Sequence, residues 1–185
     1  AGVAGIHMED QILPKRCGHY EGKQIVSTTE FIQKIKAVRE AANPDLYIIA
    51  RTDAIAVEGL DAAIKRSHKY IEAGADMLFI EAPTTVEQIK KIAAELPYPK
   101  LLNMFYSGKT PIVPLKDLKS WGYNLVIDPS DLQRASIKAM QDVLQVIKKD
   151  GHSESVKENL VSFKQREEAI NAKYYNKADK KYSNR

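Results

Sequence analysis

Residues 46–81 read LYIIARTDAIAVEGLDAAIKRSHKYIEAGADMLFIE, and this stretch indicates how the chain folds. It begins with an apolar run, 46–50, and ends with another, 77–80, each of a length typical of a buried strand. Between the two runs, apolar residues at helical spacing predict a helix from Leu60 to Ala73, which Gly74 ends. A strand, a helix and a second strand in this order predict a parallel pair joined by a right-handed crossover.

The same alternation continues in both directions along the chain. Further strands are expected over residues 3–8, 101–104 and 125–127. Helices are expected to begin at Thr28 or Thr29, to begin again at Thr84 or Thr85, and to cover 115–121, about 130–149 and about 153–172. Asn43-Pro44-Asp45 is expected to stop the first of these helices. The strands are nearly continuous apolar runs, which is typical of a sheet that is covered on both faces.

This pattern predicts an α/β fold, and within that class a (β/α)₈ TIM-type barrel of which the chain supplies about five βα units and C-terminal helices. A closed barrel needs eight strands, so we expect further residues upstream of Ala1, which precedes a strand directly and is not an initiator Met. The alternative is a complete, open sheet of five strands. The expected organisation is a partial barrel over residues 1–150, lacking its N-terminal strands, and a C-terminal helical segment with a basic tail over 151–185.

Composition narrows the functional classes. The 185 residues contain one cysteine, which excludes an internal disulfide framework. No apolar run approaches the roughly 20 residues of a membrane-spanning helix, and no signal peptide opens the chain, so we expect a soluble, cytoplasmic protein. The net charge of +4 lies in residues 157–185, but no nucleic-acid-binding motif accompanies it. A solvated tail is therefore favoured, and neither nucleic acid nor a membrane is expected as a partner.

Polar residues end each of the expected strands: Glu9-Asp10, Arg51-Thr52-Asp53, Glu81, Asn103 and Asp128. In a parallel sheet these ends lie along one edge, where α/β enzymes build their active sites. Arg51 is suited to a bidentate contact with a carboxylate or phosphate, and the alternative is a salt bridge to Asp53 or Glu81. Asn103 offers a neutral donor to an anion. Arg134, near the start of the helix after the fifth strand, could also reach one.

The loop after the first expected strand reads Lys15-Arg16-Cys17-Gly18-His19. Its cationic neighbours favour the thiolate form of Cys17, and Gly18 would let the backbone approach an anion closely. His19 could donate a hydrogen bond, act as an acid or base, or lie on the surface. A buried, inert cysteine is the alternative. The spacing supports neither a cysteine protease nor a structural zinc site.

The mouth of the expected barrel therefore offers groups suited to a small polyanion such as a di- or tricarboxylate: Arg51, Arg134, Asn103, His19 and the Gly18 backbone. Beside these cations, Glu9 and Glu81 suit a hard divalent metal such as Mg²⁺, which prefers oxygen ligands.

These segments closely resemble the isocitrate lyase/phosphoenolpyruvate mutase superfamily, particularly its methylisocitrate lyase and 2,3-dimethylmalate lyase branch. The resemblance covers nearly the whole chain and rests on residues 1–11, 15–19, 49–60, 72–83, 103–111 and Arg134. Lys-Arg-Cys-Gly-His is the most specific of these motifs and is similar to the mobile catalytic loop of the lyases. The phosphonate mutase branch generally lacks this cysteine, so Cys17 favours cleavage of a carbon–carbon bond.

The resemblance implies a homo-oligomeric barrel, a dimer or a tetramer, whose last helix is exchanged between subunits. It implies Mg²⁺ (or Mn²⁺) as cofactor and a lyase that cleaves a methylisocitrate-like 2-hydroxy di- or tricarboxylate. The products would be a 2-oxoacid such as pyruvate and succinate or a relative. The alternatives are oxaloacetate decarboxylation, a phosphonopyruvate or carboxyphosphonoenolpyruvate-type reaction on the same barrel, or an inactive truncated remnant.

The resemblance also implies roles for single residues. Cys17 would be the general acid, Glu9 would act mainly through a metal-bound water, and His19, also in the catalytic set, would bind a substrate carboxylate. The residues implied in substrate binding are Gly18, Arg51, Glu81, Asn103 and Arg134.

Two departures from the family pattern qualify these roles. The family's principal metal aspartates belong to strands upstream of Ala1, so the 185-residue chain alone is expected to be inactive. Phe105-Tyr106-Ser107 stands where the family commonly has a Glu, which leaves the identity of the 2-hydroxy acid open.

Overall fold

A parallel five-stranded sheet forms the centre of the structure, a computed structural model that describes residues 2–18, 20–42 and 45–183. Residues 1–131 and 132–185 form two compact units. The strands of the first unit follow one another in the sheet in chain order: β1 (Gly5–Glu9), β2 (Tyr47–Thr52), β3 (Met77–Ile80), β4 (Lys100–Asn103) and β5 (Leu125–Ile127). The expected α/β alternation of parallel strands and helices is therefore confirmed.

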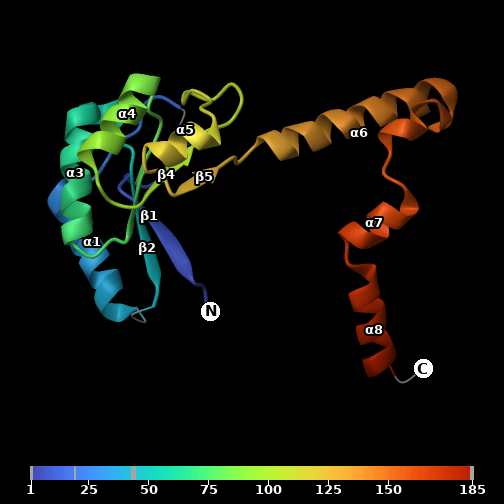
Figure 1. Cartoon of the computed structure of the whole chain (residues 1–185), viewed down its shortest axis with the longest axis horizontal. Helices are drawn as coiled ribbons and strands as arrows, with labels where there is room; N and C mark the ends of the chain where they lie inside the picture. Colours follow the sequence, from blue (N-terminus) through green and yellow to red (C-terminus); the bar gives the residue numbers. More distant parts are fainter. Residues whose placement is uncertain (1, 19, 43–44, 184–185) are drawn as a thin grey trace. The chain divides into compact units, whose positions relative to one another are not determined.

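The helices of the first unit are α1 (Thr28–Ala41), α2 (Ile55–Glu58), α3 (Leu60–Glu72), α4 (Val86–Glu95) and α5 (Leu115–Ser120). Figure 1 shows α1, α3 and α4 along one side of the strands. The main hydrophobic core lies under them and contains strand residues such as Ala50, Leu78 and Leu102. The main core of this unit is thus formed between the sheet and one layer of helices.

Alternation along the strands sends every second side chain to the opposite face of the sheet. There, Met77, Phe79 and Leu101 form a smaller apolar cluster, against which Ile49 and Ile127 pack. Arg51, two residues after Ile49, extends from the same face, and its guanidinium carbon lies 4.9 Å from the centre of the Phe79 ring. On the face opposite these helices, the smaller apolar cluster is therefore adjacent to Arg51 at the carboxyl ends of the strands.

Local signals in the sequence set most of the element ends. The Ser27 hydroxyl accepts from Glu30 N at 3.1 Å at the start of α1, and the Thr85 hydroxyl accepts from Gln88 N at 3.2 Å at the start of α4. Gly74 follows α3 in a left-handed conformation, φ +109°, that favours glycine. The expected helix starts are confirmed, whereas the expected stop at Asn43-Pro44 lies outside the described residues.

The second unit is helical and contains α6 (Asp131–Asp150, which begins one residue before it), η1 (Glu154–Asn159), α7 (Phe163–Ala169) and α8 (Ala172–Tyr182). The prediction of one continuous helix over 153–172 is wrong. Ser162 and Gln165 form a capping box that starts α7 anew, and Asn171 adopts a left-handed conformation, φ 52°, before α8. Because these units divide between Asp131 and Leu132, the assignment of 132–150 to the barrel stays a prediction.

The helices of the described part of the chain are all either too short or too polar to cross a membrane.

Candidate active site

The carboxyl ends of the strands are aligned, as the sequence predicts. In the β1–β2 pair Glu9 lies opposite Arg51, and in the β4–β5 pair Asn103 lies opposite Ile127. Asp53 and Glu81 follow β2 and β3 directly. Parallel pairing therefore gathers these polar side chains at one edge of the sheet.

Arg51 is the centre of this edge. Its Nε lies 3.0 Å from Asp53 Oδ2 and 3.3 Å from Glu9 Oε1, and its Nη2 lies 3.4 Å from Glu81 Oε2. The side chain of Arg51 is 15% exposed, whereas those of Asp53 and Glu81 are almost fully buried. The salt bridges to Asp53 and Glu81 considered from the sequence are therefore present, together with one to Glu9. Whether Arg51 also binds a substrate carboxylate stays a prediction.

The pKa values of the carboxyl groups around Arg51 are shifted in different directions. Burial raises the pKa of Asp53, and the negative charge of Glu9 adds to this in spite of Arg51. Burial also raises the pKa of Glu81. Burial by itself would raise the pKa of Glu9 too, but a hydrogen bond with Asp53 and the charges of Arg51 and Lys15 outweigh it and hold that pKa below its ordinary value. Glu9 is therefore the carboxyl group of this cluster whose ionised form its surroundings favour.

We call residues 15–22 the thiol loop. Gly18, next to Cys17, is buried against the charged cluster: a Cβ at this position would lie 2.5 Å from Glu81 Cγ and 2.7 Å from Arg51 Nη2. No side chain fits in that space, so glycine allows the backbone to approach the two charged groups. The thiol loop and Arg51 therefore lie at the same end of the sheet.

Cys17 itself is exposed and not in a disulfide, so the alternative of a buried, inert cysteine is wrong. The cations beside it in sequence have other partners. Lys15 Nζ lies 3.1 Å from Glu9 Oε2, and Arg16 Nη1 donates to the Glu21 carbonyl at 3.5 Å. Their influence on the thiol, expected from their spacing, stays a prediction.

Asn103, which the sequence predicts as a site residue, lies beside Glu81. Its Nδ2 donates to Glu81 Oε1 at 3.3 Å, while its Oδ1 is buried and has no donor among the residues that the structure describes. The same holds for the hydroxyl of Thr110, which the sequence did not single out. Buried polar atoms nearly always find a partner, so both oxygens are suited to a ligand or a water.

For two predicted site residues, a place in this cluster stays a prediction. His19 lies outside the described residues. Arg134 belongs to α6 in the second unit, and its approach to a substrate in the first unit stays a prediction.

Two polar residues that support the site were missed from the sequence. Gln11 Nε2 donates to Glu9 Oε1 at 2.6 Å and to the Arg16 carbonyl at 2.9 Å, and Gln11 Oε1 accepts from Arg16 N at 3.0 Å. Lys23 is buried at the other end of the thiol loop. Neither has a motif of its own. The signal for Lys23 is a single charge two residues before the Ile25-Val26 apolar pair, which is too common to be specific.

The supporting role of Asp10 was also missed from the sequence. Its fully buried carboxyl group fixes the ends of the strands. Its Oδ2 accepts from the Thr52 hydroxyl at 2.7 Å and from the Tyr70 hydroxyl at 2.9 Å, and its Oδ1 accepts from Asp53 N at 3.0 Å. Arg66 Nη1 lies 3.5 Å away. This network ties β1, β2 and α3 together behind the charged cluster.

The described donor groups do not by themselves form a site for the implied Mg²⁺. Within residues 2–18, 20–42 and 45–183, no three His, Cys, Asp or Glu side chains converge as a cation site requires. Glu9, Asp53 and Glu81 surround the Arg51 guanidinium instead. These residues therefore do not fit a divalent cation by themselves, and the role of Glu9 through a metal-bound water stays a prediction.

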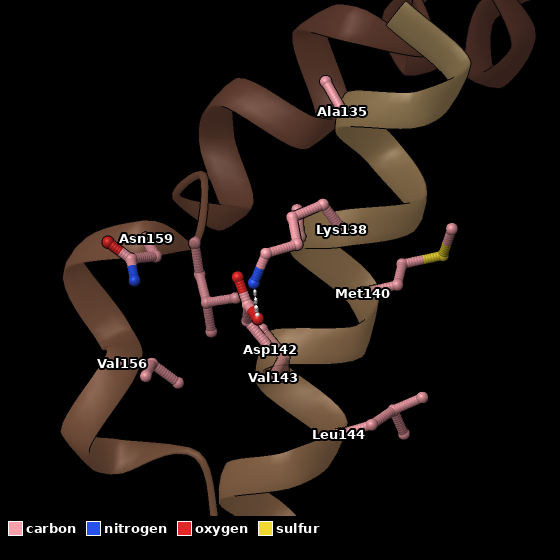
Figure 2. Close-up of a pocket in the computed structure, with 10 residues that line it drawn as sticks. Ala135, Lys138, Met140, Asp142, Val143, Leu144, Val156 and Asn159 are labelled. Carbon is pink, nitrogen blue, oxygen red and sulfur yellow. Dashed lines mark hydrogen bonds and ion pairs between the residues drawn. The ribbon is translucent and has the colours of Figure 1, made fainter.

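An apolar groove of about 770 Å³ lies within the second unit, between α6 and η1. Figure 2 shows that Lys138 and Asp142 in its lining pair with each other, while Val143, Leu144 and Val156 contribute apolar surface. The groove thus lacks the convergent, unsatisfied polar groups that a carboxylate substrate would need.

A family model, curated relatives and solved structures all place this chain in the same protein family. Residues 1–148 match the family model described as phosphoenolpyruvate phosphomutase. The 2-methylisocitrate lyase of Bacillus subtilis (strain 168) is 47% identical over 168 residues, which are 91% of this chain and 54% of that protein. The chain thus spans about half the length of this curated relative.

Solved structures agree with this. That of 2,3-dimethylmalate lyase, a PEP mutase/isocitrate lyase superfamily member, superposes with a TM-score of 0.86 at 31% identity, over 97% of this chain and 60% of that one. A phosphonopyruvate hydrolase in complex with oxalate and Mg²⁺ gives 0.81 at 29% identity, over 98% and 63%. The predicted TIM-type fold, a (β/α) barrel to which this chain contributes five strands, is confirmed.

Proposed function

This chain belongs to the phosphoenolpyruvate phosphomutase family of the isocitrate lyase/PEP mutase superfamily, and on that basis we propose that the intact protein is a carbon–carbon lyase. Its substrate is a 2-hydroxy di- or tricarboxylate of the methylisocitrate type. Cleavage releases a 2-oxoacid such as pyruvate and leaves succinate or a relative. The intact protein works as a homo-oligomer, with Mg²⁺ or Mn²⁺ as its cofactor.

One observation carries this proposal: the thiol loop lies directly on the charged cluster. The Gly18 backbone approaches Arg51 and Glu81 so closely that a Cβ would overlap both side chains. A carboxylate bound at Arg51 is therefore next to the segment that carries Cys17. A proton donor beside an anion-binding group is what the cleavage of a carboxylic acid needs.

In the proposed reaction, the substrate hydroxyl loses its proton and the adjoining carbon–carbon bond breaks. The bonding electrons remain on the departing carbon, which becomes a carbanion next to a carboxylate. Cys17 then transfers its thiol proton to that carbon. Arg51 holds a substrate carboxylate, and the Glu9 carboxylate receives the hydroxyl proton through a water, so that the proton lost by the substrate and the one supplied by Cys17 are both accounted for.

A buried acceptor of the site supports a hydroxylated substrate. Asn103 Oδ1, beside Glu81, has no donor among the described residues. A hydroxyl or a protonated carboxyl group of a ligand can supply one, which a simple dianion cannot. Phe105-Tyr106-Ser107 precedes Thr110 and is the segment from which we expect the choice among 2-hydroxy acids to come.

The test is to assay the intact protein against methylisocitrate, isocitrate, dimethylmalate, oxaloacetate and phosphonopyruvate, with wild-type Cys17 and with Cys17→Ser. Turnover of a 2-hydroxy acid is expected for the wild type. The variant should lose about 10² to 10⁴ in kcat, the usual contribution of a positioned acid, and keep its fold by circular dichroism. Turnover of oxaloacetate or phosphonopyruvate alone, or a Cys17→Ser variant with full activity, would reject the lyase.

A further inference from the structure

Lys23 is a buried cation that the proposed chemistry does not use. Its side chain is 1% exposed, although lysine is among the residues least often buried without a charged partner. It follows Gly22 at the carboxyl end of the thiol loop. Burial of an ammonium at this point requires specific partners rather than packing alone.

Those partners are two carbonyls of the thiol loop itself. Lys23 Nζ donates to the carbonyl of Gly18 and, at 3.1 Å, to that of Tyr20. It also lies 3.8 Å from Asp53 Oδ1. An ammonium has three N–H donors and no acceptor, so these groups account for its bonding capacity. Lys23 is therefore engaged within the protein and is not suited to bind a substrate.

The rest of the thiol loop has little apolar packing to hold it. Arg16 and Cys17 are exposed, and a hollow of about 200 Å³ is lined by Arg16 and Lys23. Gln11 holds the start of the loop through the backbone of Arg16. Lys23 holds the middle of the loop through the carbonyls of Gly18 and Tyr20, at the point where Gly18 contacts the charged cluster.

Lys109 forms a second attachment of the loop, but on the surface. It pairs with Glu21, whose side chain is 83% exposed. Solvent and salt screen such pairs, which typically contribute little to stability. The buried ammonium of Lys23 and the partly exposed one of Lys109, whose side chain is 32% exposed, therefore contact the same loop in two different environments.

We propose that Lys23 is a positioning residue that holds the thiol loop against Arg51 and Glu81 and connects it to Asp53. Without its ammonium, two loop carbonyls lose their donor and the loop leaves the cluster. The position of Cys17 relative to the substrate then becomes variable. The catalytic part of this inference rests on the proposed function, whereas the attachment of the loop does not.

The test compares Lys23→Met with Lys109→Met, which makes the same substitution at the exposed attachment. Hydrogen–deuterium exchange, read by mass spectrometry, should become about tenfold or more faster in the thiol loop of Lys23→Met only, with β2 and β3 unchanged. The kcat of Lys23→Met should fall about 10²-fold, the usual cost of misplacing a reacting group, with a much smaller change in KM. Lys23→Arg keeps the charge and should recover part of both losses.

Three results would overturn the inference. The first is a thiol loop that exchanges in Lys23→Met as slowly as in the wild type. The second is faster exchange spread equally over β2 and β3, which would make Lys23 a general stabilising residue. The third is a loosened loop with unchanged kcat. If the wild type has no lyase turnover, the proposed function fails, and the exchange measurement alone still decides whether Lys23 holds the loop.

Discussion

Arg66 and Arg51 are both largely buried arginines of the first unit, but different kinds of partner hold them. Arg66 donates to the two carboxylate oxygens of Glu58 at 2.7 and 2.8 Å, to the Val26 carbonyl at 3.0 Å and to the Tyr70 hydroxyl at 3.1 Å. The polar partners described for Arg51 are carboxylates, at 3.0 to 3.4 Å. Arg66 is thus attached to the backbone and to a hydroxyl as well as to the Glu58 carboxylate, whereas the polar partners described for Arg51 are all carboxyl groups.

This difference separates a structural role from a functional one. A guanidinium hydrogen-bonded to a backbone carbonyl and a core tyrosine cannot exchange those partners without disturbing the fold. A guanidinium between carboxyl groups at the edge of a sheet can exchange one of these partners for another anion. Its contacts are longer than those of Arg66 to Glu58, and burial raises the pKa of two of its partners, Asp53 and Glu81. We therefore expect changes at Arg51 to affect turnover first and changes at Arg66 to affect stability first.

The largest effect is expected from Arg51→Met on turnover. The substrate carboxylate loses a bidentate partner, which should lower kcat/KM by about 10²- to 10⁴-fold. Arg51→Lys retains the charge without the planar fork and should fall between this variant and the wild type. Steady-state kinetics on the intact protein measures both. An Arg51→Met variant with near wild-type kcat/KM would mean that Arg51 only joins the carboxylates.

Arg66→Met should affect stability instead, with a loss of about 3–5 kcal/mol in the free energy of unfolding. The reason is that Asp10 loses a nearby positive charge and the buried Val26 carbonyl loses its donor. Denaturant titration gives this value, and Lys34→Met, which breaks an exposed pair on α1, is the matched control. If Arg66→Met were as stable as the control, the contrast between the two arginines would disappear.

A smaller, pH-dependent effect is expected at Glu81. Burial is the main cause that raises its pKa, and Asp53 adds to it. A carboxyl group whose pKa is higher in the folded state stabilises the fold most below the unfolded pKa, and this contribution is lost as pH rises through the folded pKa. Glu81→Gln does not titrate there. Its free energy of unfolding, compared with the wild type, should therefore improve as pH rises from about 4, the ordinary pKa of a glutamate, through the raised folded value.

Glu58, the partner of Arg66, should show the opposite sign and the smallest effect. Its hydrogen bonds to Arg66 lower its pKa. A group with a lowered pKa contributes stability above its unfolded pKa and loses it as pH falls through the folded value. Glu58→Gln should therefore lose stability relative to the wild type near neutral pH and approach it in acid. Unfolding curves of both variants at several pH values test this, and equal signs would contradict the comparison.

The strands were predictable because their signals are local. Short apolar runs with polar ends indicate buried parallel strands, and the runs 77–80 and 125–127 agree with β3 and β5. The bounds of the other strands differ by one or two residues. In β1 and β2 the backbone pairing continues into Glu9, Arg51 and Thr52, which the apolar pattern leaves outside. Hydrogen bonding of the main chain does not depend on side-chain polarity.

The C-terminal helices were predicted less well because an apolar periodicity hides helix breaks. Ser162 followed by Gln165 is a capping-box signature and could have indicated the start of α7. The left-handed conformation at Asn171 has a weaker signal, since asparagine only tolerates it. Local capping residues thus deserve more weight than continued periodicity where a helix of about 20 residues is expected.

The amino-acid sequence by itself determined the succession of strands and helices, the parallel sheet and the gathering of polar strand ends along one edge. These follow from periodicity and chain connectivity, which act over a few residues at a time. The tertiary structure alone decided that Arg51 is shared among Glu9, Asp53 and Glu81, and that Lys23 is buried beneath Gly18 and Tyr20. Charge pairing in a desolvated site depends on distances of a few ångströms between separate strands and loops, and packing sets these distances.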